Sequence, residues 1–130
     1  MIVDTSAIVA IVLNEPEKPI FVKALIHADQ ASMSAGSWLE LEAVVVRRGN
    51  PALAAAAERM LADMDVEIVG VSIEQAGIGR AAYRKFGRGT GHPAGLNFGD
   101  CFSYALAQST GRPLLFKGED FANTDIEAAV

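Results

Sequence analysis

Four acidic residues stand directly beside apolar runs, where a carboxylate is difficult to keep charged. They are Asp4 after Met1-Ile2-Val3, Glu40 in Ser37-Trp38-Leu39-Glu40-Leu41, Asp100 in Leu96-Asn97-Phe98-Gly99-Asp100-Cys101-Phe102, and Asp120 after Leu114-Leu115-Phe116-Lys117-Gly118-Glu119. A carboxylate withdrawn from water has a raised pKa or needs a cation nearby. Several such groups gathered together repel one another unless a multivalent cation lies between them. Because hard divalent ions prefer oxygen ligands, these residues indicate an all-oxygen metal site.

The length and composition are typical of one globular domain over residues 1–130. The 130 residues are 51% hydrophobic and 21% charged, enough for a sizeable core and too apolar for a disordered chain. The first thirteen residues are mostly apolar, but they contain Asp4, lack a basic segment and are too short to cross a bilayer. The single cysteine, Cys101, cannot form an internal disulfide, which fits a reducing compartment. We therefore expect a cytoplasmic protein that does not enter the membrane.

The charge is distributed unevenly along the chain. A net charge of −5 argues against a general nucleic-acid binder, because phosphate contacts require Lys and Arg. Residues 1–75 hold 11 acids and 5 Lys or Arg, whereas residues 76–99 hold four bases and no acid. Arg80, Arg84 and Arg88 are four residues apart and would form one stripe on a helix. This stripe is either a solvated helix face or, beside an acidic metal site, an edge that contacts phosphates.

Short apolar runs alternate with longer helical patterns, which predicts an α/β fold with a parallel sheet. The expected strands are Met1–Asp4, Ala31–Ser34, Val66–Val71 and Pro113–Phe116. The expected helices are Ser6–Leu13, Glu17–His27, Ser37–Arg48, Pro51–Met64, Ser72–Phe86 and Phe98–Ser109. Ser37-x-x-Glu40 and Ser72-x-x-Gln75 match the capping box of a helix start. The glycine-rich run from Gly87 to Gly99 predicts a loop, and it lacks the phosphate-binding pattern G-x-x-x-x-G-K-[ST].

Three of the four acids are expected at the same edge of this sheet. Ligands of an open parallel sheet bind outside the carboxyl ends of its strands. Asp4 ends the first strand, Asp120 follows the last one, and Glu40 starts a helix directly after a strand. A shared site is therefore plausible on the simplest topology.

Asp4 and Glu40 each have an alternative, purely structural role. Asp4 could cap the first helix, although Thr5 and Ser6 are equally able to do so. Glu40 could be the glutamate of a capping box. Its rival Glu42 lies two residues further on and would point about 200° away, so at most one of the two faces the site.

The other two acids have alternatives as well. Asp100 in a first turn is favoured by the helix dipole whatever its function. Asp120 competes with Glu119 and Asp125 for the fourth position. Two hydroxyl residues are candidate auxiliary groups of the site, Ser6 and Thr124.

Several of these segments together resemble one protein family. They are Asp4-Thr5-Ser6, the acid of Ser37-x-x-Glu40, and Leu96-Asn97-Phe98-Gly99-Asp100-Cys101-Phe102-Ser103-Tyr104-Ala105-Leu106-Ala107, followed by Pro113 to Phe121 and Thr124-Asp125-Ile126. The set resembles PIN-domain ribonucleases, in particular VapC-type toxins, over essentially the whole chain. The resemblance assigns the family's acids to Asp4, Glu40, Asp100 and Asp120. It implies a three-layer α/β/α fold with a central parallel sheet of four to five strands.

The resemblance also implies a function. It is that of an endoribonuclease dependent on Mg²⁺, with Mn²⁺ as a substitute, acting as the toxin of a type II toxin–antitoxin system. Asp4 and Asp100 would bind the metal, and Glu40 and Asp120 would act through water or hold a second ion. We expect a homodimer, an RNA substrate and a VapB-type antitoxin whose C-terminal segment lies in the groove. The residues expected to contact the RNA backbone are Arg80, Arg84, Lys85, Arg88 and Lys117.

Other acid-and-metal folds do not match the residues. A phosphatase with an aspartyl nucleophile has Asp-x-Asp at its first strand, but here Ser6 is in the third position. A phospho-receiver domain has an aspartate at the end of its third strand, where this chain has Ser72. The alternative of a different class is a catalytically silent PIN-fold module that binds RNA or protein, and the presence of all four acids argues against it. His27 and His92 lie away from every acid motif, and we assign them no role.

Overall fold

The computed structural model describes residues 1–130 and has a parallel sheet of four strands at its centre. The strands are β1 (Ile2–Val3), β2 (Ser32–Ser34), β3 (Glu67–Val69) and β4 (Leu114–Leu115), in the order β3-β2-β1-β4. Every pairing between them is parallel, and Ile2 lies in register with both Ser32 and Leu114. Each strand falls inside a range predicted from the sequence, so the predicted α/β class and parallel sheet are confirmed.

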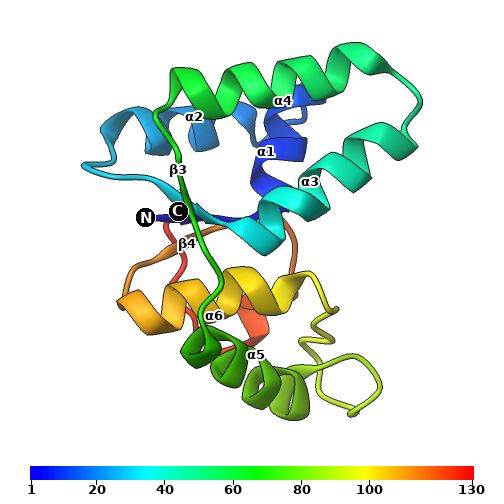
Figure 1. The fold of residues 1–130 in the computed structure, drawn as a ribbon, viewed down its shortest axis with the longest axis vertical. Coiled ribbons are helices and arrows are strands. Elements are labelled where there is room, and N and C mark those ends of the chain that lie inside the picture. Colours follow the sequence, from blue (N-terminus) through cyan, green and yellow to red (C-terminus); the bar gives the residue numbers. More distant parts are fainter.

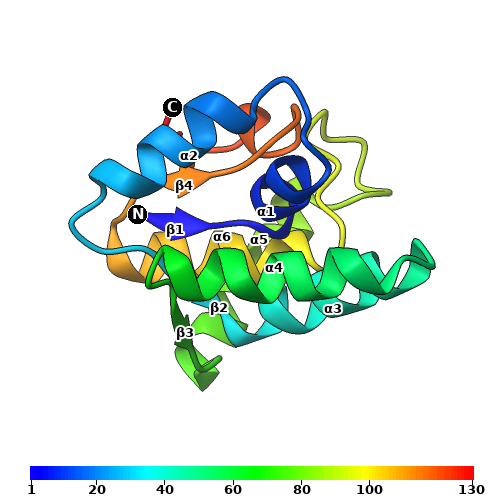
Figure 2. The same ribbon diagram turned by 90° about the horizontal axis from the view of Figure 1, so that it is seen from above.

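Helices cover the sheet on both sides (Figures 1 and 2). They are α1 (Thr5–Val12), α2 (Lys18–His27), α3 (Ala35–Arg47), α4 (Pro51–Asp63), α5 (Ile73–Phe86) and α6 (Asp100–Thr110), followed by the short 3-10 helix η1 (Phe121–Asn123). Figure 1 shows α5 and α6 on one side of the strands and α1, α2 and α4 on the other. The three predicted layers are therefore present. None of these helices combines the length and the hydrophobicity that a membrane span requires.

The strands separate two hydrophobic cores because successive strand residues point to opposite faces. Val3 and Leu115 belong to the core beneath α1, α2, α3 and α4, whereas Ile2 and Leu114 belong to the core beneath α5 and α6. All four of these side chains are fully buried. A parallel sheet covered on both faces requires such continuous apolar strands, and the sequence supplies them.

The start of α3 differs from the prediction. The N-cap is Ser34, whose hydroxyl accepts a hydrogen bond from the Gly36 N–H, so the helix begins directly at the end of β2. Ser37 therefore lies inside the helix, and the predicted capping box of Ser37 with Glu40 is wrong. The consequence is that the Glu40 carboxylate is free for another role.

Helices α3 and α6 approach closely at a glycine. A Cβ atom on Gly36 would overlap the ring of Phe102, so only glycine allows this packing. The contact joins the first turn of α3 to the first turn of α6. It brings Glu40 and Asp100, which are far apart in the sequence, to the same region of the molecule.

Candidate active site

A cleft of about 260 Å³ lies where these helix starts meet the ends of the central strands. Its wall includes all four predicted acids, Asp4, Glu40, Asp100 and Asp120, together with Thr5, Ser6, Asn97 and Lys117. Asp4 follows β1, and Lys117 and Asp120 follow β4. The cleft is thus at the carboxyl edge of the sheet, where ligands of open parallel sheets bind.

Asp4 is the N-cap of α1 and is almost fully buried. Its Oδ2 accepts hydrogen bonds from the Ser6 N–H at 2.9 Å and from the Ser6 hydroxyl at 2.6 Å. Its Oδ1 accepts one from the Ser103 hydroxyl at 2.6 Å. Hydrogen bonds of this kind stabilise the charged carboxylate. Asp4 therefore does cap α1, and the same hydrogen bonds fix the orientation of its carboxylate in the cleft.

Asp100 is held by a reciprocal pair of hydrogen bonds with Asn97. The Asn97 N–H donates to Asp100 Oδ2 at 2.8 Å, and the Asp100 N–H donates to Asn97 Oδ1 at 2.9 Å. This is the arrangement of a capping box, built here from Asn and Asp. Asn97 was not among the predicted site residues, although the spacing Asn97-x-x-Asp100 is that of a capping box.

Glu40 faces the cleft and Glu42 does not. Glu40 Oε2 accepts a hydrogen bond from the Thr5 hydroxyl at 2.8 Å, whereas the Glu42 side chain is exposed. The backbone of Gly99 lies against the Glu40 carboxylate, and a Cβ atom at that position would overlap it. Gly99 is therefore needed for Glu40 to lie beside the start of α6, where Asp100 is located.

Asp120 reaches the cleft and its rival Asp125 does not. Asp125 accepts a hydrogen bond from the Tyr104 hydroxyl at 2.6 Å and lies 3.7 Å from the Lys85 ammonium. Thr124 is not among the residues that line the cleft, and its hydroxyl donates to the Phe121 carbonyl at 2.7 Å. The structure therefore does not support Thr124 as an auxiliary hydroxyl.

The carboxylates in the cleft disfavour one another's charge. Burial raises the pKa of Asp100 to about 7, and the negative charges of Asp4, Asp120 and Glu40 add to this effect. Burial also raises the pKa of Glu40, with the charge of Asp4 contributing and the hydrogen bond from Thr5 opposing. A bound cation would relieve this repulsion.

The donor set fits a hard divalent ion that retains water. All the acidic groups in the cleft present oxygen atoms, and neither histidine nor Cys101 lines it. No three acidic, histidine or cysteine side chains are arranged to hold one ion directly between them. An ion held here would have few protein ligands, as is usual for Mg²⁺, which gives up its water reluctantly.

Both lysines that were predicted to contact RNA, Lys85 and Lys117, lie close to acidic side chains. The Lys117 ammonium lies 2.7 Å from Glu15 Oε2 and 3.1 Å from Glu17 Oε2, and hydrogen bonds to these two groups raise its pKa. Lys85 lies beside Asp125 and over the ring of Phe86, 4.5 Å from its centroid. Both lysines are thus partly neutralised by contacts within the molecule.

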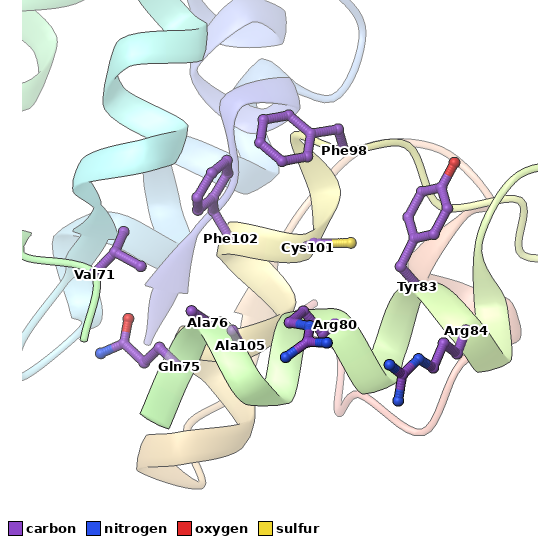
Figure 3. A pocket seen from close by; sticks show the side chains of 11 residues that line it. Val71, Gln75, Ala76, Arg80, Tyr83, Arg84, Phe98, Cys101, Phe102 and Ala105 are labelled. Atoms are coloured by element: carbon purple, nitrogen blue, oxygen red, sulfur yellow. The ribbon is translucent and has the colours of Figure 1, made fainter. Parts of the chain in front are cut away.

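Arg80 and Arg84 border a second, apolar cleft, whereas Arg88 lies beyond the end of α5, so the prediction that all three arginines form one stripe on a helix is wrong for Arg88. This cleft, of about 450 Å³ between α5 and α6, is lined by Arg80 and Arg84 together with Phe98 and Phe102. Figure 3 shows the arginines on the α5 side and the two phenylalanines on the α6 side. Arg80, Arg84 and Arg88 are exposed and form no ion pair. Because Phe98 lies between Asn97 and Asp100 in the chain, the apolar cleft adjoins the acidic one.

Comparison with known proteins gives a consistent result. Residues 1–127 match the family model "PIN domain". Ribonuclease VapC42 of Mycobacterium tuberculosis is 49% identical over 129 residues, covering 99% of this chain and 98% of the relative. Ribonuclease VapC28 of the same organism is 45% identical over 130 residues, covering 100% of this chain and 98% of the relative.

Solved structures share the fold at lower identity. The crystal structure of VapC20 from Mycobacterium tuberculosis, described as a sarcin-ricin loop cleaving toxin, has a TM-score of 0.71 at 21% identity and covers 96% of this chain and 95% of its own. A toxin–antitoxin complex from Klebsiella pneumoniae has a TM-score of 0.68 at 17% identity and covers 95% of this chain and 92% of its own.

Proposed function

The chain belongs to the PIN-domain family, among its VapC ribonucleases, and from this we propose that it is the endoribonuclease toxin of a type II toxin–antitoxin system. Residues 1–130 would form one PIN domain that cleaves RNA in the cytoplasm. The observation that carries the proposal is the convergence of Asp4, Glu40, Asp100 and Asp120 in one cleft.

Mg²⁺, or Mn²⁺ in its place, would be held by Asp4 and Asp100, directly or through water. When bound, the ion supplies a hydroxide nucleophile and stabilises the charge that develops on the phosphate. Glu40 and Asp120 would orient water molecules on the open side of the cleft or help to hold a second ion. Asn97, Ser6 and Thr5 would keep the carboxylates in place through the hydrogen bonds described above.

The RNA backbone would lie along the unpaired arginines. Arg80, Arg84 and Arg88 are exposed, and phosphate contacts by such residues are the main source of affinity for nucleic acid. The carboxylates that hold Lys85 and Lys117 reduce the charge these lysines offer to phosphate. We therefore expect the three arginines to make the main contacts with the RNA phosphates and the two lysines to contribute less.

The cognate partner would be a VapB-type antitoxin. An acidic cleft that carries no bound cation attracts a basic side chain, and electrostatic complementarity of this kind gives a partner its specificity. A basic residue in the C-terminal segment of the antitoxin would compete with the metal for Asp4 and Asp100 and so inhibit cleavage.

A homodimer through the apolar cleft between α5 and α6 would bury exposed aromatic surface. The Phe98 side chain is 76% exposed, although it lies among apolar neighbours. The arginines would then lie at the rim of the interface, where charged residues are common.

Phe98→Ala is expected to weaken the dimer at least ~10-fold, because a buried aromatic side chain is a typical hot spot of an interface. Ile26→Ala is the matched control, since Ile26 is 62% exposed on α2, away from this cleft. Sedimentation equilibrium over a range of concentrations measures both dissociation constants. A monomeric wild-type chain, or equal effects of the two substitutions, would contradict the proposed interface.

The proposed activity is tested with total RNA and the purified chain. Cleavage is expected with Mg²⁺ or Mn²⁺ and should stop when EDTA is added. A thermal melt should shift upward with Mn²⁺, because a ligand that binds the native state stabilises it. RNA binding without any metal-dependent cleavage would instead favour the silent binding module.

A further inference from the structure

Two serines outside the predicted site form a buried chain of hydroxyl groups that ends on Asp4. Ser37 and Ser103 are both fully buried, and their Oγ atoms are 2.8 Å apart. Ser103 Oγ lies 2.6 Å from Asp4 Oδ1. Neither serine lines the acidic cleft, so the chain approaches Asp4 from the protein side.

The direction of this chain follows from counting hydrogen atoms. A charged carboxylate can only accept, so the one hydroxyl hydrogen of Ser103 points to Asp4. Ser103 must then accept from Ser37, and the O–H groups point from Ser37 to Ser103 to Asp4. Hydrogen bonds arranged in sequence polarise one another, which strengthens the last one in the chain.

Ser37 also lies beside the hydroxyl group that contacts Glu40. The Thr5 hydroxyl is 3.0 Å from the Ser37 carbonyl and 2.8 Å from Glu40 Oε2, and its single hydrogen is shared between these two acceptors. One residue of α3 thus contacts the hydrogen-bonding partners of two different carboxylates.

The hydrogen bonds to Asp4 leave its two oxygens unequal. Oδ2 accepts from both the Ser6 N–H and the Ser6 hydroxyl, so its two lone-pair directions are used. Oδ1 accepts only from Ser103 and keeps one lone pair. The oxygen that remains able to ligate a cation is therefore Oδ1, and Ser103 controls its orientation.

We propose that Ser37 and Ser103 are positioning residues that hold Asp4 Oδ1 toward the metal, an inference that rests on the proposed metal-dependent function. Partners of this kind, which orient the ligands of a metal, typically change metal affinity or activity 10- to 100-fold when they are removed. The role differs from capping, which Ser6 and Asp4 already fulfil for α1.

The test is a Mn²⁺ titration of the chain of residues 1–130, read by electron paramagnetic resonance in the absence of RNA. Ser103→Ala is expected to raise the dissociation constant for Mn²⁺ about 10-fold. Ser109→Ala is the matched control on the same helix, because its exposed hydroxyl contacts only the Leu106 carbonyl. The control should bind Mn²⁺ like the wild type.

A double-mutant cycle distinguishes a relay, in which Ser37 orients Ser103 and Ser103 orients Asp4, from independent packing effects of the two serines. Ser37 acts on Asp4 only through Ser103, so the double variant should bind Mn²⁺ about as weakly as Ser103→Ala alone. Independent packing effects would add instead. Ser103→Cys, which has a similar volume and a weak donor, should fall between the wild type and Ser103→Ala. If Ser103→Ala does not fold, the Mn²⁺ affinity of Ser103→Cys tests the proposal in its place.

Wild-type affinity in Ser103→Ala and Ser103→Cys, or additive effects of the two alanine substitutions, would overturn the relay. Neither result would affect the proposed ribonuclease activity. A wild-type chain that binds no Mn²⁺ would instead overturn the proposed function together with the relay. The two failures are therefore distinguishable.

Discussion

Replacing Asp100 by Asn is expected to lower the rate of metal-dependent RNA cleavage by a factor on the order of 10³ or more, because a metal ligand supplies several kcal/mol of transition-state stabilisation. The fold should persist. The Asp100 Oδ2 atom accepts a hydrogen bond from the Asn97 N–H, and an asparagine oxygen can accept the same bond. Single-turnover cleavage of a labelled RNA at saturating Mn²⁺ measures the effect.

Two further measurements make this test specific. Without metal, Asp100→Asn should melt no lower than the wild type, because the repulsion from Asp4, Asp120 and Glu40 is reduced. Asp125→Asn is the control, since Asp125 lies outside the cleft and contacts Tyr104 and Lys85. It should retain the rate of cleavage. Full activity of a folded Asp100→Asn variant would refute the assignment of Asp100.

Mn²⁺ binding is expected to weaken as the pH falls below about 7, where Asp100 takes up a proton. The ion must displace that proton, so the apparent affinity should fall about 10-fold for each pH unit below 7. Mn²⁺ titrations at several pH values between about 5.5 and 8 measure this slope. In Asp100→Asn the slope should be much smaller.

The Asp100 carboxyl group also makes the stability of the metal-free chain decrease as the pH rises. The pKa of Asp100 is about 7 in the folded state against the ordinary value of 3.8 for a free aspartate, so the folded state binds more protons between these values. The contribution of Asp100 to the free energy of unfolding therefore decreases as the pH rises from about 4 to 7 and is constant outside that window. Urea denaturation across this range measures it, and a wild-type contribution independent of pH would contradict the raised pKa.

The sequence alone determined the elements of the fold. Alternation of apolar runs and helical patterns is a local property, and Val3 and Leu115 show why it suffices: a strand buried on both faces must be continuously apolar. The position of Asp4 at the end of β1 followed from the same pattern. The resemblance to PIN-domain ribonucleases then assigned the four acids, and the structure places all of them in one cleft.

Choices between neighbouring residues were decided only by the tertiary structure. Ser34 and Ser37 are both good helix caps by type, and the helix begins at the one that directly follows β2. Asp120 and Asp125 both follow the last strand, but Tyr104 of α6 holds Asp125 outside the cleft. Local rules describe a residue and its neighbours within a turn or two, so they cannot rank candidates that differ only in what packs against them.

The hydrogen bonds that orient the acids were likewise decided only by the tertiary structure. Ser103 and Asp4 are 99 residues apart in the chain, and the close approach of α3 to α6 at Gly36 accompanies the contact of Ser37 with Ser103. No periodicity or spacing encodes a bond of that range. The sequence alone shows which residue types can bind a metal. The packing of helices that are distant in the sequence determines which hydrogen-bond donor contacts each carboxylate oxygen.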